Sequence, residues 1–126
     1  MLMCEFLTDA QHKLPVKAVV YNNSAFGLIT LEAESIGVPA YKQGIAFPNP
    51  DYAALARACG GGGFKAEKPG ELRDAIDKAL KAEGPAIIDC VVAADELPNF
   101  PHLELEKIGN FAIAKIKEAV LAVTGP

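Results

Sequence analysis

Residues 19–29, with the sequence VVYNNSAFGLI, place amide and small side chains directly after a hydrophobic run that predicts a buried strand. An asparagine side-chain carbonyl is a hard oxygen ligand that suits Mg²⁺, and a nearby backbone carbonyl can supply a second ligand. Ser24 and Ala25 leave room for a ligand, and Gly27 allows the backbone to approach one closely. The stretch alone is a weak signal of a metal and phosphate site, because Asn-Asn-Ser is also ordinary turn chemistry.

The polarity of this stretch within the fold supports a binding role. In open α/β sheets, ligands bind at the carboxyl ends of strands, where the N-terminus of the next helix faces an anion. Residues 22–27 join a predicted strand to a predicted helix and have this polarity. The glycine run at 60–63 joins a helix to a strand, so we expect a helix end and a turn there rather than a phosphate cradle.

Other polar residues offer weaker candidates for chemistry. His12 and His102 have no neighbouring nucleophile or acid at a spacing typical of a triad, so we expect both to be solvated. Glu32 could face the site, and a solvent-facing or ion-paired acid is the alternative. Asp89 interrupts an apolar strand and could cap a neighbouring backbone group. These patterns identify no catalytic residue in the chain.

Composition excludes several functional classes. The net charge of −4 and the absence of a basic stripe argue against a nucleic-acid partner. No apolar run reaches the ~18 residues of a membrane span, and the start lacks the basic region of a signal peptide, so we expect a cytoplasmic protein. Cys4, Cys59 and Cys90 have no zinc or disulfide spacing, and we expect three reduced, small hydrophobic side chains.

The order of the predicted elements indicates the fold class. Helices are expected at 3–13, 25–35, 50–59, 69–83 and 106–123, with strands at 16–21, 64–66 and 86–93 and a loop over 37–50. This alternation predicts an open α/β parallel sheet with helices on both faces. The nearly all-apolar segment 86–93 is typical of a strand covered on both faces. Three strands are few for such a sheet, so the chain is expected to form part of a larger fold.

Hydrophobic periodicity also predicts which helix faces are buried. Asn49 is expected to cap the helix at 50–59, with Pro50 at its first position and Asp51 in its first turn. The apolar helix at 25–35 is expected to be buried on more than one side. The inner face of the last helix is predicted to comprise Ile108, Phe111, Ala112, Ile116, Ala119 and Val120.

Four segments together resemble a known family. They are MLMCEFLTDAQHKLPVKAVVYNNSAFGLITLEAE, PDYAALARACG, EKPGELRDAIDKALKAEGPAIIDCVVAADELP and LEKIGNFAIAKIKEAVL. They resemble the thiamine-diphosphate-binding segment of the pyruvate oxidase and acetolactate synthase family, nearest to its quinone-dependent pyruvate dehydrogenase (pyruvate oxidase) branch. The resemblance covers essentially the whole chain in one register. It implies that residues 1–126 are one domain, the C-terminal portion of a diphosphate-binding domain, with residues 98–126 as an extension that contains the final helix.

The resemblance also implies a site. In that family an Asp of a Gly-Asp-Gly turn, the second Asn of a pair and a backbone carbonyl two residues later hold Mg²⁺. Carried over, Asn23 is the side-chain ligand and Ala25 the carbonyl ligand, and the Asp is expected four residues before Met1. The residues expected to line the diphosphate and thiazolium are Asn23, Ser24, Ala25, Phe26, Gly27, Leu28 and Ile29. Leu28 stands where the quinone-dependent branch tends to carry an aromatic residue near the substrate pocket.

The expected activity follows from the same resemblance. The parent enzyme would act on pyruvate or a related 2-oxo acid, with oxidative decarboxylation favoured and acetolactate synthase-type carboligation as the alternative. FAD is an expected cofactor of the oxidase branch but would not bind to this segment. We expect the isolated chain to be inactive, and a non-catalytic α/β module or a split subunit that needs a partner chain is the alternative. A homo-oligomer or a complementing chain is expected to cover its apolar faces.

Overall fold

The computed structural model describes residues 3–40, 42–94 and 105–124. The chain divides into two compact units. The first, here called the sheet unit, contains residues 1–22 and 48–93, and the second, the helical unit, contains residues 23–47 and 94–126. The expectation that residues 1–126 form one domain stays a prediction.

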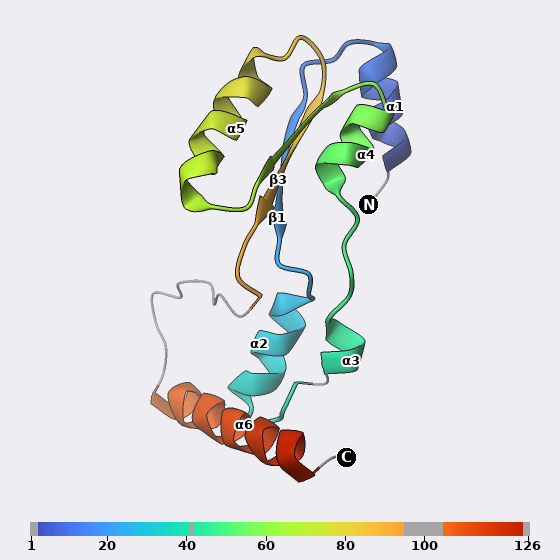
Figure 1. The fold of residues 1–126 in the computed structure, drawn as a ribbon. Helices are drawn as coiled ribbons and strands as arrows, with labels where there is room; N and C mark the ends of the chain where they lie inside the picture. The colour runs from blue at the N-terminus through green and yellow to red at the C-terminus, as the bar shows by residue number, and fades with distance from the viewer. Residues whose placement is uncertain (1–2, 41, 95–104, 125–126) are drawn as a thin grey trace. The chain divides into compact units, whose positions relative to one another are not determined.

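The sheet unit is a three-stranded parallel sheet covered by helices. Its elements are α1 (Met3–Gln11), β1 (Lys17–Asn22), α4 (Tyr52–Ala58), β2 (Gly62–Ala66), α5 (Pro69–Lys81) and β3 (Ala86–Val91). The strand order is β1-β3-β2, so the last strand in sequence is central. Figure 1 shows α5 on one face of the sheet and α1 with α4 on the other. The predicted open α/β sheet is therefore confirmed.

The core of this unit surrounds β3 on both faces. Residues 86–90 are all buried, as expected for a strand with apolar neighbours on either side. Ile88 packs in a cluster with Ala75 and Ala79 of α5, whereas Ile87 packs with Phe6 of α1 and with residues of α4. The many alanines in these clusters let the helix backbones approach the sheet closely.

The run of four glycines ends α4 and starts β2. Gly60 has a φ of +84°, the left-handed conformation that commonly ends a helix. A Cβ on Gly63 would lie 1.8 Å from the Ala53 carbonyl oxygen, so only glycine fits between α4 and β2. The predicted helix end and turn are confirmed. β2 begins at Gly62, two residues earlier than expected, because Gly62 already pairs with Ala86 of β3.

The helical unit contains α2 (Gly27–Ser35), α3 (Lys42–Ile45) and α6 (Leu105–Thr124). α3 lies inside the segment predicted to be a loop. α6 packs on α2, and two of its side chains donate hydrogen bonds to carbonyl groups at the C-terminal end of α2. Asn110 Nδ2 donates to the Ser35 carbonyl at 3.1 Å, and Lys117 Nζ donates to the Gly37 carbonyl at 2.9 Å. A cation at a helix C-terminus also complements the helix dipole.

The predicted burial of α2 is wrong. Its only buried residue is Glu34, which is 2% exposed, whereas Leu28 is 71% exposed. Lys115 of α6 forms an ion pair with Glu34, with 2.6 Å between Nζ and Oε1. Because α6 is the one long helix that packs on α2 among the described residues of the helical unit, several apolar side chains of α2 stay exposed there.

The predicted inner face of α6 is also wrong. Ala114 is its buried residue, and Ile108, Ile116 and Val120 are more than half exposed. Periodicity identified an apolar stripe correctly but not what covers it. The start of α4 differs as well: Asp51, not Asn49, is the cap, and its carboxylate accepts the Ala54 N–H at 2.7 Å.

Among the described residues, no helix is both long and apolar enough to cross a membrane.

Replacing Lys115 by Met should destabilise the helical unit by about 1–3 kcal/mol, because the buried Glu34 carboxylate loses its charged partner. The measurement is chemical denaturation, with Lys78→Met as the control because Lys78 is exposed on α5 and forms no ion pair with a described residue. Equal unfolding free energies for the two variants would contradict this role of Lys115.

The ion pair also predicts a dependence on alkaline pH. The hydrogen bond to Glu34 raises the pKa of Lys115 above its ordinary value of 10.5. Its contribution to stability is therefore complete below pH 10.5 and is lost as the pH rises through the raised pKa. The difference in unfolding free energy between the wild type and Lys115→Met should shrink over that alkaline range. A difference that stays constant there would exclude the ion pair as its source.

Candidate functional site

β1 ends in a tightly held asparagine. Asn22 is buried, and its Nδ2 donates to Asp89 Oδ1 at 3.0 Å. Its backbone carbonyl accepts the Val92 N–H at 3.0 Å, and its Oδ1 accepts a hydrogen bond from Asn49 Nδ2. The first asparagine of the pair therefore belongs to the sheet and has its polar groups occupied. The second, Asn23, begins the loop that leads into α2.

The loop from Asn23 to Gly27 uses each small residue for a geometric reason. Ser24 has a φ of +53°, a left-handed conformation that reverses the chain direction. The Ala25 N–H donates to Asn23 Oδ1 at 3.2 Å, which closes an Asx-type turn. A Cβ on Gly27 would lie 2.8 Å from Asn23 Nδ2, so glycine makes room for the amide. The Asn23 side chain is thus held back over the start of α2.

A second segment supports this loop. Two backbone hydrogen bonds of 3.1 Å join residues 24–26 to residues 45–47 around a single antiparallel bridge. The rings of Phe26 and Phe47 pack with their centroids 4.7 Å apart. Sequence reasoning missed this pairing because residues 37–50 are rich in glycine and proline and suggest only a loop. The aromatic residue at 47 was the one available signal.

The N-terminus of α2 is open to a ligand. Its cap residue, Phe26, makes no side-chain capping bond, and the first turn contains no acidic residue. The early N–H groups of a helix lack intrahelical partners and favour an anion. Phe26, Leu28 and Ile29 are each more than half exposed around this end of the helix. The arrangement combines backbone donors for an anion with an apolar surface.

The donor set suits a hard cation in part. Asn23 Oδ1 retains a lone pair beyond its bond to Ala25, and no hydrogen bond among the described residues uses the Ala25 carbonyl. Amide and carbonyl oxygens are ligands that Mg²⁺ accepts, but it prefers six in octahedral geometry. Over residues 3–40, 42–94 and 105–124, no group of three His, Cys, Asp or Glu side chains could hold a metal. The described residues could therefore supply two of the six oxygen ligands of a magnesium ion.

The remaining polar residues that the sequence suggested differ in their exposure to solvent. His12 is exposed as expected, and His102 lies outside the described residues. Glu32 is exposed, so it is the solvent-facing acid that was one of the two expectations for it. Asp89 is fully buried and accepts the Tyr52 N–H at 3.3 Å, which confirms that it caps a backbone group. Its second partner, Asn22, was not predicted.

The three cysteines differ in burial. Cys4 is exposed, Cys59 intermediate and Cys90 buried, and all are free thiols. Burial, with a smaller effect from Asp89, raises the pKa of Cys90. The thiol is therefore protonated at neutral pH and behaves as the small hydrophobic side chain that its sequence context predicted.

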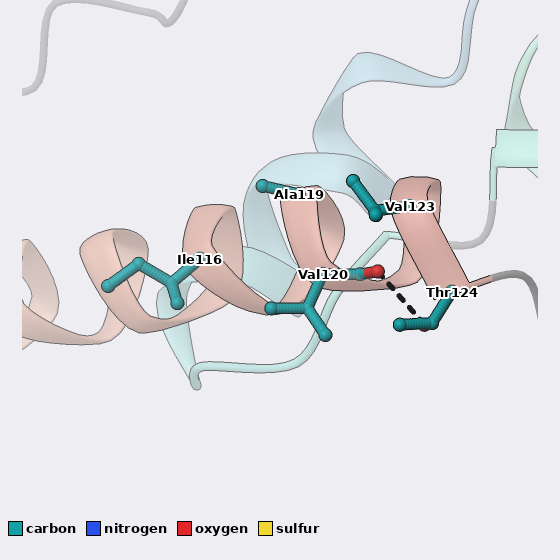
Figure 2. A pocket seen from close by; sticks show the side chains of 5 residues that line it. All are labelled: Ile116, Ala119, Val120, Val123 and Thr124. Atoms are coloured by element: carbon teal, nitrogen blue, oxygen red, sulfur yellow. Dashed lines mark hydrogen bonds between the residues drawn. The ribbon is translucent and has the colours of Figure 1, made fainter.

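A shallow hollow on α6 offers no chemistry of its own. Figure 2 shows its lining, which consists of Ile116, Ala119, Val120, Val123 and Thr124. The Thr124 hydroxyl donates to the Val120 carbonyl of the same helix at 2.9 Å. The other four side chains are aliphatic, so the hollow is an apolar surface and not a catalytic one.

An open parallel sheet, with a loop that follows the carboxyl end of a strand and leads into an uncapped helix, is an arrangement typical of α/β domains that bind ligands. The chain belongs to the thiamine pyrophosphate enzymes: residues 1–90 match the family described as thiamine pyrophosphate enzyme, C-terminal TPP binding domain. The resemblance to thiamine-dependent enzymes inferred from the sequence is thereby confirmed, and the pyruvate oxidase branch stays a prediction. The site loop at 23–29 lies inside the matched region.

Individual relatives agree with this assignment. YdaP of Bacillus subtilis is 35% identical over 92 residues, which cover 73% of this chain and 16% of YdaP. An acetolactate synthase of Bacillus subtilis is 29% identical over 75% of this chain and 18% of its own length. A 2-hydroxyacyl-CoA lyase of Oryza sativa subsp. japonica is 31% identical over 70% of this chain and 16% of its own length.

A solved structure supports the fold. Benzoylformate decarboxylase from Polynucleobacter necessarius matches with a TM-score of 0.65 and 29% identity, over 75% of this chain and 18% of that chain. The chain therefore spans less than a fifth of the length of the relatives it matches.

Replacing Gly27 by Ala should move the Asn23 amide without unfolding the helical unit. The new Cβ would meet a side-chain end that can rotate away, so the loss of stability should stay below about 1 kcal/mol. The measurement is the NMR shift of the Asn23 side-chain NH₂ group. Gly109→Ala is the control, because nothing lies within 4 Å of its added Cβ. An unmoved Asn23 signal in Gly27→Ala would contradict the close packing.

Proposed function

We propose that residues 23–29 bind the diphosphate of thiamine diphosphate together with Mg²⁺. The Asn23 side-chain oxygen and the Ala25 backbone carbonyl serve as two of the metal ligands. The observation that carries the proposal is the Asn23 amide, which is folded back over an uncapped helix start and needs glycine at position 27. Membership of the thiamine pyrophosphate enzymes supports the choice of cofactor.

The proposed roles follow from the geometry of each residue. The first N–H groups of α2, from Gly27 and Leu28, donate to diphosphate oxygens, which the helix dipole also favours. Ser24, with its φ of +53°, gives the chain reversal in which the Ala25 N–H meets Asn23 Oδ1. The exposed side chains of residues 26, 28 and 29 provide an apolar surface for the thiazolium ring. When bound, the cofactor supplies a thiazolium that stabilises a carbanion.

The proposed activity of the whole protein is the decarboxylation of pyruvate or a related 2-oxo acid. The relatives include acetolactate synthases, and a matched structure is a benzoylformate decarboxylase. Oxidative decarboxylation is favoured by the resemblance of the sequence to the oxidase branch, in which FAD would bind to parts of the parent outside this segment. Acetolactate synthase-type carboligation is the second candidate, and the acetolactate synthase relatives favour it.

The isolated chain is proposed to be inactive and to need further protein around its site. The described residues supply two oxygen ligands and no metal-binding carboxylate cluster. The exposed apolar side chains Phe26, Leu28 and Ile29 also suit a covering surface, from a second copy or from a complementing chain. A non-catalytic α/β module remains the alternative, and a cytoplasmic location stays a prediction.

Titration of the ¹⁵N-labelled chain with thiamine diphosphate and Mg²⁺, followed by NMR, tests this proposal even when binding is weak. Shifts are expected at the amides of residues 23–29, they should require Mg²⁺, and Asn23→Ala should weaken binding by about tenfold or more. Asn110→Ala is the matched control, since it removes the same amide group from a contact at the other end of α2.

Binding within about twofold of the wild type is expected for Asn110→Ala, because it leaves the metal ligands in place. Three results would refute the site: no Mg²⁺-dependent shift in the wild type, shifts centred elsewhere, or unchanged binding by Asn23→Ala.

A further inference from the structure

Asp89 is a buried acid with no cationic partner among the described residues. It lies in the middle of β3, in register with Val20 of β1 and Lys65 of β2, and its side chain is 0% exposed. Lys65 pairs instead with Glu67, at 2.8 Å. A buried carboxylate is costly unless its oxygens are hydrogen-bonded, so its partners must matter to the fold around it.

The two carboxylate oxygens of Asp89 bind two different segments. Oδ1 accepts from Asn22 Nδ2 at 3.0 Å, and Oδ2 accepts from the Tyr52 N–H at 3.3 Å. The first bond holds the end of β1, and the second holds the first residue of α4. Asn49 extends the set, because it donates to Asn22 and accepts the Tyr52 hydroxyl at 2.9 Å.

These bonds fix one peptide group next to the site. The Asn22 carbonyl, bonded to the Val92 N–H, and the Asn23 nitrogen belong to the same planar unit. Asp89 holds the Asn22 side chain, and Val92 holds its carbonyl. With its side chain and its carbonyl both bonded, Asn22 anchors to the sheet unit the peptide group that leads into Asn23.

We infer that Asp89 is a positioning residue for the metal ligand Asn23 and acts through Asn22. This inference rests on the proposed function of residues 23–29. Asp89 itself touches neither metal nor diphosphate. Its carboxylate is needed, and not only its volume, because both groups that face it are donors. An asparagine at this position can accept only one of those two bonds and points its own NH₂ group at the other donor.

The test compares Asp89→Asn with a variant that destabilises the same unit without touching Asn22. Ala79→Gly serves as that control, because Ala79 of α5 is buried in the cluster on the face of the sheet opposite α4, and glycine weakens a helix. Three quantities are measured: the unfolding midpoint, the hydrogen-exchange rate of the Val92 amide, and the Mg²⁺-dependent affinity for thiamine diphosphate.

For Asp89→Asn we expect faster exchange at Val92 and an affinity about tenfold weaker, as for other residues that orient metal ligands. Asn22→Ala should reproduce both effects, and the double variant should be no worse than either single one. Ala79→Gly should lower the unfolding midpoint with the affinity within about twofold of the wild type.

The three measurements distinguish failure of the positioning role of Asp89 from failure of the proposed cofactor site. An unchanged Val92 exchange rate in both Asp89→Asn and Asn22→Ala would overturn the positioning role, whatever the affinity. An equal loss of affinity in Ala79→Gly would also overturn it, because the effect would then be general destabilisation. If the wild-type chain shows no Mg²⁺-dependent binding while Val92 exchange responds as expected, the proposed function fails and the held Asn22 peptide stands as a structural feature. The inferred role toward a metal ligand would fall with it.

Discussion

The buried Asp89 carboxylate imposes the constraint on which this end of the sheet depends. A charge in the central strand of a doubly covered sheet must be surrounded by donors, and the structure supplies an asparagine side chain and a backbone N–H. Those two donors come from the end of β1 and the start of α4. The same carboxylate thus ties together segments that are 30 residues apart, from Asn22 to Tyr52, and fixes where the first strand ends.

This constraint explains the division of labour in the asparagine pair. Asn22 is buried and fully engaged, so its role is structural. Asn23 follows in a turn closed by Ala25 and accommodated by Gly27, and its side-chain oxygen keeps capacity for a ligand. The strand boundary therefore separates two identical residues into one whose side chain is held in the sheet unit and one for which we propose a ligand role.

The elements and the location of the loop could be predicted well, because both depend on local patterns. The apolar run of β3 and the periodicity of α5 have few alternative interpretations. The apolar faces of α2 and α6 are also visible in the sequence, but most of their large apolar side chains are exposed among the described residues, since periodicity cannot show what lies opposite a helix. The pairing of residues 24–26 with 45–47 and the contacts of Asp89 depend on tertiary proximity and leave only faint traces in the sequence.

The chain provides the part of a thiamine pyrophosphate enzyme that includes the site loop, within less than a fifth of the length of its relatives. The central claim, that Asn23 and Ala25 are metal ligands, is tested most directly by a crystal structure of the chain with thiamine diphosphate and Mn²⁺, located by anomalous scattering. We expect a metal at about 2.0–2.3 Å from Asn23 Oδ1 and from the Ala25 carbonyl oxygen, with diphosphate at the start of α2. A metal bound elsewhere, or cofactor density without contact to these two oxygens, would contradict it.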